Sequence, residues 1–329
     1  MTLLLILVVV AALAFDFING FHDTANAIAT VVSTRVLSPG WAILMAAGLN
    51  LVGALIATAV AKTIAGDIVD AHTATTALTL AAVIGGIVWN LLTWYFGIPS
   101  SSSHALIGGL IGAAVAHAGI EGVKWAGLMN KVVLWLVISP IIGFGIGYVI
   151  MTAINLFFAN ARPSRVGGVF RRLQVVSAAA MSVAHGSNDA QKSMGIITLA
   201  LVSAHQIPKA DVPLWVKLSC ATVMALGTSV GGWRIIKTMG HKIIRLEPVN
   251  GFAAETAGAI TIFTAGHFGA PVSTTHVIAG SIFGVGASKR LRAVRWGVAL
   301  EMAIAWVLTI PAAAVVGAAT YGLLHLIGL

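Results

Sequence analysis

Charged residues are scarce in this chain. Of its 329 residues, 19 are Lys or Arg and 10 are Asp or Glu, so only 9% are charged, against about 25% in a soluble globular domain. With 58% hydrophobic residues and a mean hydropathy of +0.97, a soluble fold of this size would have too few charged residues for its water-exposed surface. A soluble enzyme is therefore excluded, and so is intrinsic disorder. The remaining class is an all-α polytopic membrane protein.

Cysteine and N-terminal basic residues are also nearly absent. The single cysteine, Cys220, excludes a disulfide framework and any cysteine-based metal site. No Lys or Arg precedes the first apolar run, Leu3 to Phe15, so we expect a membrane segment there and not a cleaved signal peptide. The net charge of +9 lies in three short clusters and not along one face, which argues against a nucleic-acid partner.

Long apolar stretches make up most of the chain, and a membrane-spanning helix needs about 20 residues. The stretches at 3–34 and 174–205 are longer and carry polar residues in their middle, so we expect helices broken at mid-depth. The stretches at 99–117 and 271–287 are short, begin with Pro and are rich in Ser and Thr, and either full spans or re-entrant segments fit them. The other stretches are 41–61, 74–96, 132–158, 213–233, 249–268 and 296–326.

The sequence contains an internal duplication. Gly20-Phe-His-Asp23 aligns with Gly186-Ser-Asn-Asp189 at an offset of 166, and Pro99 to His104 aligns with Pro271 to His276 at an offset of 172. Two motifs in the same order, at nearly half the chain length, predict two repeats. The predicted parts are a first membrane repeat at 1–160, a short basic cytoplasmic loop at 161–172 and a second membrane repeat at 173–329.

Three clusters of basic residues set the expected orientation. The positive-inside rule places all three in the cytoplasm, with an even number of apolar stretches between successive clusters. Each half then has about five crossings, and both termini lie outside. An odd number per repeat inverts the second half relative to the first, as in secondary transporters with interrupted helices. The clusters are Arg162, Arg165, Arg171 and Arg172; Arg234, Lys237, Lys242 and Arg245; and Lys289, Arg290, Arg292 and Arg295.

The two segments that begin with Pro point to an anion site. Pro99 and Pro271 are followed by Ser and Thr, which favour helix N-caps. A helix N-terminus has free N–H groups and the positive end of the helix dipole, which suit an oxyanion. The hydroxyls at 101–103 and 273–275 add donors, so two such ends from inverted halves would face one anion. The alternative is that these hydroxyls have only a structural role and form hydrogen bonds to the backbone of their own membrane helices.

Ionisable residues within membrane segments are costly, and they are candidate functional residues. Asp23 and Asp189 occupy equivalent positions in the two halves, so we expect them to bind the coupling ion beside the anion. Lys192 offsets one of their charges. Glu255 is an asymmetric candidate for ion coupling, because Val83 holds the matching place. The other such residues are Asp16, His22, His104, His185, His276 and Glu301, and for Asp16 and Glu301 a purely structural role is an equal alternative.

Asn19 to Ala27 and His185 to Ser193 resemble the duplicated signature of the inorganic phosphate transporter (Pit) family, and the two Pro–Ser/Thr–His motifs are also similar to that family's. The resemblance covers essentially the whole chain. It implies a symporter of inorganic phosphate in the cell membrane, with an inverted-repeat fold and, at the family level, a homodimer. It implies no catalytic residue, no metal-ligating residue and no cofactor besides the co-transported H⁺ or Na⁺. The implied phosphate-binding residues are Asn26, Ser101, Ser102, Ser103, Asn188, Ser273, Thr274 and Thr275, and we add Lys192 for its positive charge.

The two signatures depart from the family's common form, G-A-N-D-x-A-N-A. The first half has Phe21-His22 in place of Ala-Asn, and the second has Gln191-Lys192-Ser193 in place of Ala-Asn-Ala. This variant is similar to the bacterial low-affinity branch, which is associated with proton coupling and neutral metal–phosphate complexes. Since Lys192 puts a fixed positive charge where an Asn would help to hold a cation, we expect protons to be the coupling ion, with sodium as the alternative.

Other functions are compatible with the same residues. A sulfate permease of the same fold is one, because these donors bind any tetrahedral oxyanion, and a passive anion channel is another. In a different class, an intramembrane aspartyl protease would use Asp23 and Asp189 as a dyad that shares a proton. Against it, Asp189 stands in Gly-Ser-Asn-Asp and not in Gly-x-Gly-Asp.

Overall fold

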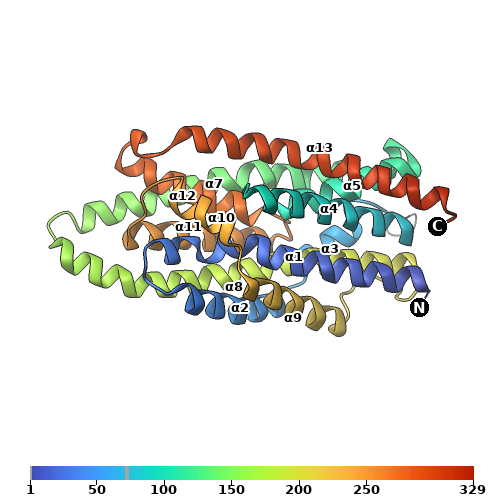
Figure 1. Cartoon of the computed structure of the whole chain (residues 1–329), viewed down its shortest axis with the longest axis horizontal. Helices are drawn as coiled ribbons and strands as arrows, with labels where there is room; N and C mark the ends of the chain where they lie inside the picture. The colour runs from blue at the N-terminus through green and yellow to red at the C-terminus, as the bar shows by residue number, and fades with distance from the viewer. Residues whose placement is uncertain (1, 71–73) are drawn as a thin grey trace.

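The computed structural model describes residues 2–70 and 74–329, and nearly all of its ordered elements are helices. They form an elongated bundle with both chain termini at one end, which we call the terminal end (Figure 1). The helices are α1 (Leu3–Ser33), α2 (Pro39–Ile56), α3 (Ala59–Gly66), α4 (Thr76–Phe96), α5 (Ser102–Ala118), α6 (Trp125–Gly127), α7 (Leu134–Phe157), α8 (Pro163–Ser203), α9 (Leu214–Val230), α10 (Trp233–His241), α11 (Pro248–His267), α12 (Thr274–Lys289) and α13 (Trp296–Leu326).

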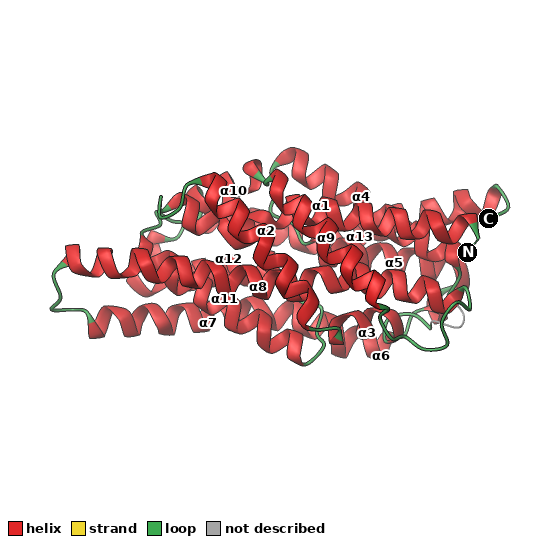
Figure 2. Ribbon diagram, turned by 90° about the horizontal axis from the view of Figure 1, so that it is seen from below, coloured by secondary structure: helices red, strands yellow, loops and turns green. Residues whose placement is uncertain are grey.

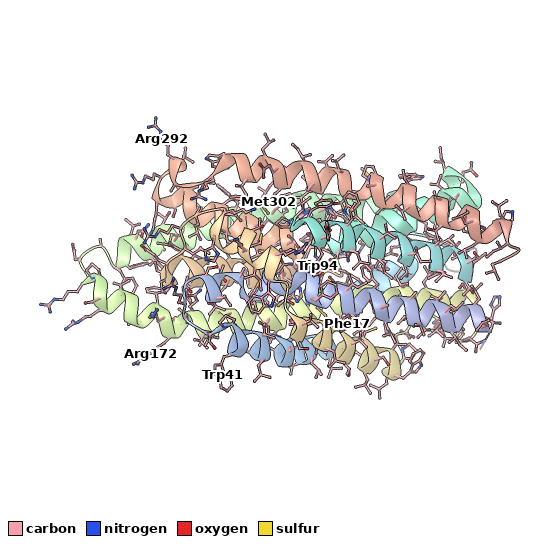
Figure 3. All side chains as sticks on the ribbon, viewed as in Figure 1. Phe17, Trp41, Trp94, Arg172, Arg292 and Met302 are labelled. Carbon is pink, nitrogen blue, oxygen red and sulfur yellow. The ribbon has the colours of Figure 1, made fainter. Side chains whose placement is uncertain are left out.

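Basic residues mark the opposite end of the bundle, which we call the basic end. Arg172 and Arg292, from two of the three basic clusters, project there (Figure 3). At this end α7 and α8 extend beyond the other helices (Figure 2). The common location of these two clusters agrees with the charge pattern that the positive-inside rule uses. The cytoplasmic orientation of this end stays a prediction.

The two long polar segments, α1 and α8, are continuous helices of 31 and 41 residues. At 1.5 Å per residue α1 is about 47 Å long, which exceeds a hydrocarbon core of about 30 Å. Neither helix has a proline beyond its first residue, and the hydroxyls of Thr24 and Ser187 donate to carbonyls of the preceding turn. Because polar side chains are accommodated without unwinding the backbone, the prediction that these two helices break at mid-depth was wrong.

The basic segment predicted as a loop at 161–172 is also mostly helical, since α8 begins at Pro163. The connection from α7 therefore spans only residues 158–162. Phe170 is buried, and its ring packs edge-to-face against the rings of Phe158 and Phe252. This packing stabilises about three helical turns ahead of the apolar part of α8.

The breaks in helices occur in the partners of α1 and α8. Helices α9 and α10 meet at an angle of 71° across Gly231, whose φ of +77° is readily adopted only by glycine. In the other half, α2 ends at Ile56 and α3 begins at Ala59. There the side-chain oxygen of Gln191 in α8 accepts hydrogen bonds from the N–H groups of Val60 and Ala61 (2.8 and 3.2 Å). Gln191 thus satisfies free donors at the start of α3.

Two hairpins, α4–α5 and α11–α12, each start and finish at the same end of the bundle. Near the outer ends of the first, the N–H of Lys124 donates to the carbonyl of Ile68 (2.9 Å). At the outer ends of the second, Lys289 lies 3.2 Å from Glu247. Each hairpin returns the chain to the end of the bundle at which it started. A hairpin therefore adds either two membrane crossings or none, and the expected odd number of crossings in each half is the same in both cases.

The tips of the hairpins are the two Pro–Ser/Thr segments, and helix caps form where the sequence predicted them. Ser101 and Ser273 are the N-caps of α5 and α12. Their hydroxyl oxygens accept from the N–H groups of His104 and His276, at 3.2 Å in both cases. The two tips touch, because the hydroxyl of Ser103 donates to the carbonyl of Val272 (3.0 Å).

Glycines let the polar helices approach their neighbours closely. A Cβ added to Gly20 of α1 would lie 2.5 Å from the carbonyl oxygen of Met224 in α9. A Cβ added to Gly186 of α8 would clash with the backbone of Asn50 in α2. Such contacts hold α1 and α8 at fixed depths relative to α9 and α2.

Five helical segments are long and apolar enough to cross a membrane, namely α1, α2, α4, the run Trp125–Phe157 and α13, and the bent pair α9–α10 makes a sixth. The fold is an all-helical polytopic membrane protein, as predicted. Helices α1 and α8 run in opposite directions (Figure 1). Ten crossings and an inverted symmetry of the two halves stay predictions.

Candidate functional site

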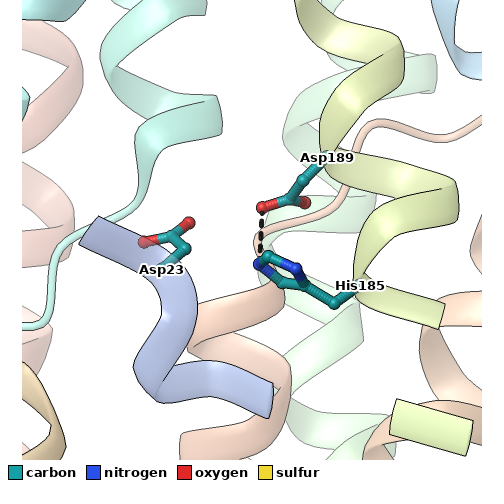
Figure 4. A group of neighbouring side chains, drawn as sticks. All are labelled: Asp23, His185 and Asp189. Atoms are coloured by element: carbon teal, nitrogen blue, oxygen red, sulfur yellow. Dashed lines mark ion pairs between the residues drawn. The ribbon is translucent and has the colours of Figure 1, made fainter. Parts of the chain in front are cut away.

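Asp23 of α1 and Asp189 of α8 lie side by side in the interior of the bundle (Figure 4). Both are at most 2% exposed. A carboxylate oxygen of each and a ring nitrogen of His185 all lie within 4.8 Å of one another. The two residues that the duplicated motif singled out thus form one centre and not two separate sites.

Each of these carboxylates is bound by the first turn of a hairpin helix from its own half. The hydroxyl of Ser102 in α5 donates to Oδ2 of Asp23 (3.1 Å). In the matching place, the hydroxyl of Thr274 in α12 donates to Oδ2 of Asp189 (3.1 Å). Bonds to a charged acceptor are among the strong hydrogen bonds, so the hairpin tips are tied to α1 and α8.

The nitrogen-bearing partners of the two carboxylates differ between the halves. Oδ1 of Asp23 lies 2.6 Å from Nδ1 of the adjacent His22. Oδ1 of Asp189 lies 2.5 Å from Nζ of Lys192, and its Oδ2 lies 3.3 Å from Nε2 of His185. Among the described residues at the centre, the only lysine therefore comes from the second half. Its ammonium group is in contact with the carboxylate of Asp189.

The two asparagines of the motifs provide amide groups beside the carboxylates. The amide nitrogen of Asn26 donates to the hydroxyls of Thr274 and Thr275 (3.1 and 2.9 Å), which joins the two halves. The amide nitrogen of Asn188 donates to the carbonyl of Ala270 (3.3 Å). The side-chain oxygens of both asparagines are buried and have no hydrogen-bond partner among the described residues, so each can accept from a ligand.

The structure brings the predicted phosphate-binding residues to the hairpin tips and the facing helices, and all of them are at most 1% exposed. They divide into two groups by their present contacts. The hydroxyls of Ser101, Ser103 and Ser273 and the amide of Asn188 bond backbone groups of the tips. The side chains of Ser102, Thr274, Thr275, Asn26 and Lys192 bond other side chains, and such bonds can be exchanged for bonds to a ligand.

Glu255 of α11 lies apart from the two aspartates. Its Oε1 accepts from the hydroxyl of Thr30 (2.5 Å) and from the amide of Gln174 (3.2 Å), and its Oε2 accepts from the hydroxyl of Ser177. It is fully buried. Since Thr30 and Gln174 lie on the basic-end side of Asp23 and Asp189 along α1 and α8, Glu255 forms a second polar centre between the first one and the basic end.

Two cavities flank the central site, one at each hairpin. A cavity of about 420 Å³ is lined by the first tip at Pro99, by Thr93 and by Lys242, which directly follows α10. A cavity of about 520 Å³ is lined by the break between α2 and α3, by Lys62 and by Ser187, which directly precedes Asn188. Each cavity therefore adjoins residues of the centre and carries a lysine.

Sequence reasoning assigned no role to His22, His185 and Gln191, although the two histidines were counted among the buried ionisable residues. His185 stands four residues before Asp189, which places both side chains on one helix face, and this spacing is the signal that could have found it. No sequence signal indicates that Gln191 caps α3, because that contact joins segments about 130 residues apart.

A buried polar centre between two hairpin tips, in a polytopic helical bundle, defines a membrane transporter and not a surface receptor or an enzyme with an open cleft. The chain matches the model of the phosphate transporter family over residues 19–317. It belongs to that family.

Relatives of known name agree with this assignment. The chain is 53% identical to a probable low-affinity inorganic phosphate transporter of Bacillus subtilis over 328 residues, which cover 99% of this chain and 98% of the relative. It is 49% identical to a protein of the same description from Rhizobium meliloti over 320 residues, 97% and 96% of the two chains. Its fold is similar to a solved structure described as the sodium-dependent phosphate transporter, with a TM-score of 0.89, 26% identity and coverage of 99% and 100%.

The protein is therefore a multi-pass membrane phosphate transporter and not an enzyme. The geometry also speaks against an aspartyl protease dyad. In such a dyad two carboxylates share one proton because two like charges so close together cannot both be ionised, whereas here Asp189 is paired with the ammonium of Lys192.

Proposed function

We propose that this protein is a proton-coupled symporter of inorganic phosphate. The observation that carries the proposal is the ammonium of Lys192, buried 2.5 Å from Asp189. A sodium ion at this carboxylate would have to share it with a positive charge that is already in place, in surroundings that screen poorly. Protons do not need a set of free oxygen ligands, so proton coupling is compatible with the lysine.

Phosphate would bind where the two hairpin tips meet α1 and α8. The hydroxyls of Ser102 and Thr274 and the amide of Asn26 would turn from their present acceptors to phosphate oxygens, and Lys192 would add an ionic bond. The starts of α5 and α12 contribute free N–H groups and the positive ends of two helix dipoles. The unpaired oxygens of Asn26 and Asn188 would accept from a protonated phosphate oxygen, a donor that sulfate lacks at neutral pH.

Phosphate would also travel as a neutral complex with a divalent metal, which is then cargo and not a resident cofactor. Asp23, His185 and Asp189 offer two carboxylates and an imidazole within 4.8 Å, a donor set that suits Mn²⁺ and Zn²⁺ as well as harder cations. Since the metal would bind as part of a complex with phosphate, whose charge would draw the ammonium of Lys192 away from Asp189, it would not share this carboxylate with the lysine as an uncomplexed sodium ion would. No metal-ligating residue was assigned from the sequence, because His185 was not connected with the two aspartates.

Glu255 would serve the coupling ion on the basic-end side of the phosphate site. Three side-chain donors converge on its carboxylate, from Thr30, Gln174 and Ser177. These donors would bond the carboxylate once the proton has left. A proton that leaves the centre with phosphate would therefore meet an acceptor before it reaches the basic end. The Glu255→Gln variant, which keeps the shape and one accepting oxygen but not the charge, should lose proton-driven accumulation.

The test is uptake of radiolabelled phosphate into proteoliposomes under separately imposed proton and sodium gradients. We expect concentrative uptake with the proton gradient alone, no competition by excess sulfate, and faster uptake when Mg²⁺ or Mn²⁺ is present. Uptake that needs sodium at constant pH would overturn the proton proposal and leave the phosphate assignment intact. Uptake that never exceeds equilibrium under either gradient would indicate a passive channel.

The metal proposal has a separate control. The His185→Gln variant should transport phosphate without metal at close to the parent rate and lose most of the stimulation by metal. Equal stimulation of parent and variant would contradict a role for His185 with the metal–phosphate complex.

A further inference from the structure

A continuous row of polar side chains follows one face of α1. Asp16, Asn19, Asp23, Asn26 and Thr30 alternate at spacings of three and four residues, so their side chains lie above one another on the helix. The row runs from the terminal-end side, through Asp23 at the phosphate site, to Thr30, which donates to Glu255. Asp23 and Asn26, in the middle of the row, belong to the proposed phosphate site, and Thr30 at its basic end binds Glu255. Its terminal-end part, Asp16 and Asn19, has no role so far.

Asp16 is the outermost carboxyl of this row, and it forms no ion pair with any described residue. It is fully buried, and neither of its carboxylate oxygens has a hydrogen-bond partner among the described residues. Both side-chain atoms of Asn19, between Asp16 and Asp23, are likewise buried and unpaired. A buried carboxyl without a partner is costly in its charged form, and a bound proton removes that cost.

The second half has no equivalent of Asp16. At the motif offset of 166 residues the matching place is Ser182, whose hydroxyl donates to the carbonyl of Ala178 (2.8 Å). If this position only served helix packing in both repeats, a serine would be sufficient at position 16 as it is at position 182. The carboxyl is therefore an addition to one half, as a coupling site in an asymmetric pathway would be.

The charged groups that face Asp16 come from α8 and α9. From α8 they are Lys192 and Asp189, with the hydroxyl of Ser193 alongside, and from α9 the thiol of Cys220 faces the carboxyl. Helix α4, which also packs against α1, contains no Asp, Glu, Lys, Arg or His. Lys192 thus acts electrostatically on both Asp16 and Asp189.

We propose that Asp16 is the loading site for the coupling proton on the terminal-end side, and that Lys192 links this proton to phosphate; the proposal rests on proton-coupled phosphate symport. When phosphate draws the ammonium of Lys192 toward itself, Asp16 loses the positive charge that favours its ionised form, so it takes up a proton from the terminal-end solution. When phosphate leaves, the ammonium is again available to Asp16, and the proton is released along the row through Asn19. Loading of the two solutes is then cooperative by linkage.

The experiment compares two modes of transport in proteoliposomes, with wild type, Asp16→Asn and Asp16→Glu. Exchange of labelled for unlabelled phosphate at equal pH on both sides needs no net proton movement. Net accumulation of phosphate under an imposed pH gradient does need net proton movement. A gradient of about one pH unit drives about tenfold accumulation per coupled proton. We expect Asp16→Asn to exchange phosphate within about threefold of wild type while its accumulation falls about tenfold, and Asp16→Glu to restore accumulation.

The control variant is Asp211→Asn, which removes an exposed carboxylate paired with Lys62 at 2.7 Å and should change neither mode. Asp16→Ser, neutral and smaller, repeats the comparison if Asn does not fit the packed site. Wild-type accumulation by the Asn or Ser variant would overturn the proposal, and so would loss of exchange together with accumulation in a folded variant, since that marks a structural residue. Failure of the wild type itself to accumulate with protons would instead refute the proposed function.

Discussion

Removal of the buried ammonium at the centre should destabilise the fold by a predictable amount. The Lys192→Met change keeps most of the side-chain volume and deletes the charge that stands 2.5 Å from Asp189. Both side chains are at most 1% exposed, so solvent cannot replace the lost partner. Breaking a buried ion pair in this way costs about 3–5 kcal/mol. His185, at 3.3 Å, and the bond from Thr274 remain on Asp189, so we expect a value near the lower limit, about 3 kcal/mol.

The measurement is unfolding of the purified protein in mixed micelles with increasing dodecyl sulfate. The double variant Lys192→Met with Asp189→Asn should be more stable than Lys192→Met alone, because it no longer buries an unpaired carboxylate. The exposed pair of Lys62 and Asp211 supplies the control, and Lys62→Met should leave the unfolding midpoint unchanged. A Lys192→Met variant as stable as the parent, or a double variant less stable than the single one, would refute the reasoning.

Three further changes test the packing and the anion site. Gly186→Ala should cost about 1–3 kcal/mol because its Cβ meets backbone of α2, and Gly145→Ala, which has open space around it, should not shift the unfolding midpoint. Ser273→Ala removes the N-cap of α12 and should cost about 1 kcal/mol, measured in the same assay; an unchanged midpoint would mean that the cap is not needed. Thr274→Val keeps shape but removes the hydroxyl between the two halves, so the KM of phosphate uptake should rise about tenfold, as the loss of about 1.4 kcal/mol predicts, whereas an unchanged KM would place phosphate elsewhere.

The helices themselves follow closely from local sequence. Pro99 and Pro271 with their Ser and Thr neighbours specify where α5 and α12 begin, because the cap uses a side chain only three residues from the N–H that it accepts from. The long apolar stretches likewise predict the helices and the membrane class, since the cost of unsatisfied backbone in lipid leaves few alternatives. The duplicated motif also identified Asp23 and Asp189 as members of one site, through their equivalent positions.

The predictions that failed concern the continuity of the helices. Mid-helix polar residues in α1 and α8 resemble a break in a hydropathy pattern, yet Ser187 bonds a carbonyl of the preceding turn, and Asp23 and Asn26 bond side chains of other helices. Whether such residues unwind a helix depends on those partners, and the sequence does not identify them. The same holds for the start of α8, where burial of Phe170 against Phe252 keeps a basic segment helical.

The sequence by itself determined the class of protein, the duplicated motifs, the helix ends at the hairpin tips and the pair of aspartates, because each depends on composition or on residues close in the chain. Only the tertiary structure decided which partners Asp23 and Asp189 have, that Glu255 forms a separate centre, that Gln191 caps α3 and that Asp16 is buried without an ion pair. These features depend on contacts between helices far apart in the chain. In a buried site, where charge is not screened, such contacts decide what each ionisable group can do.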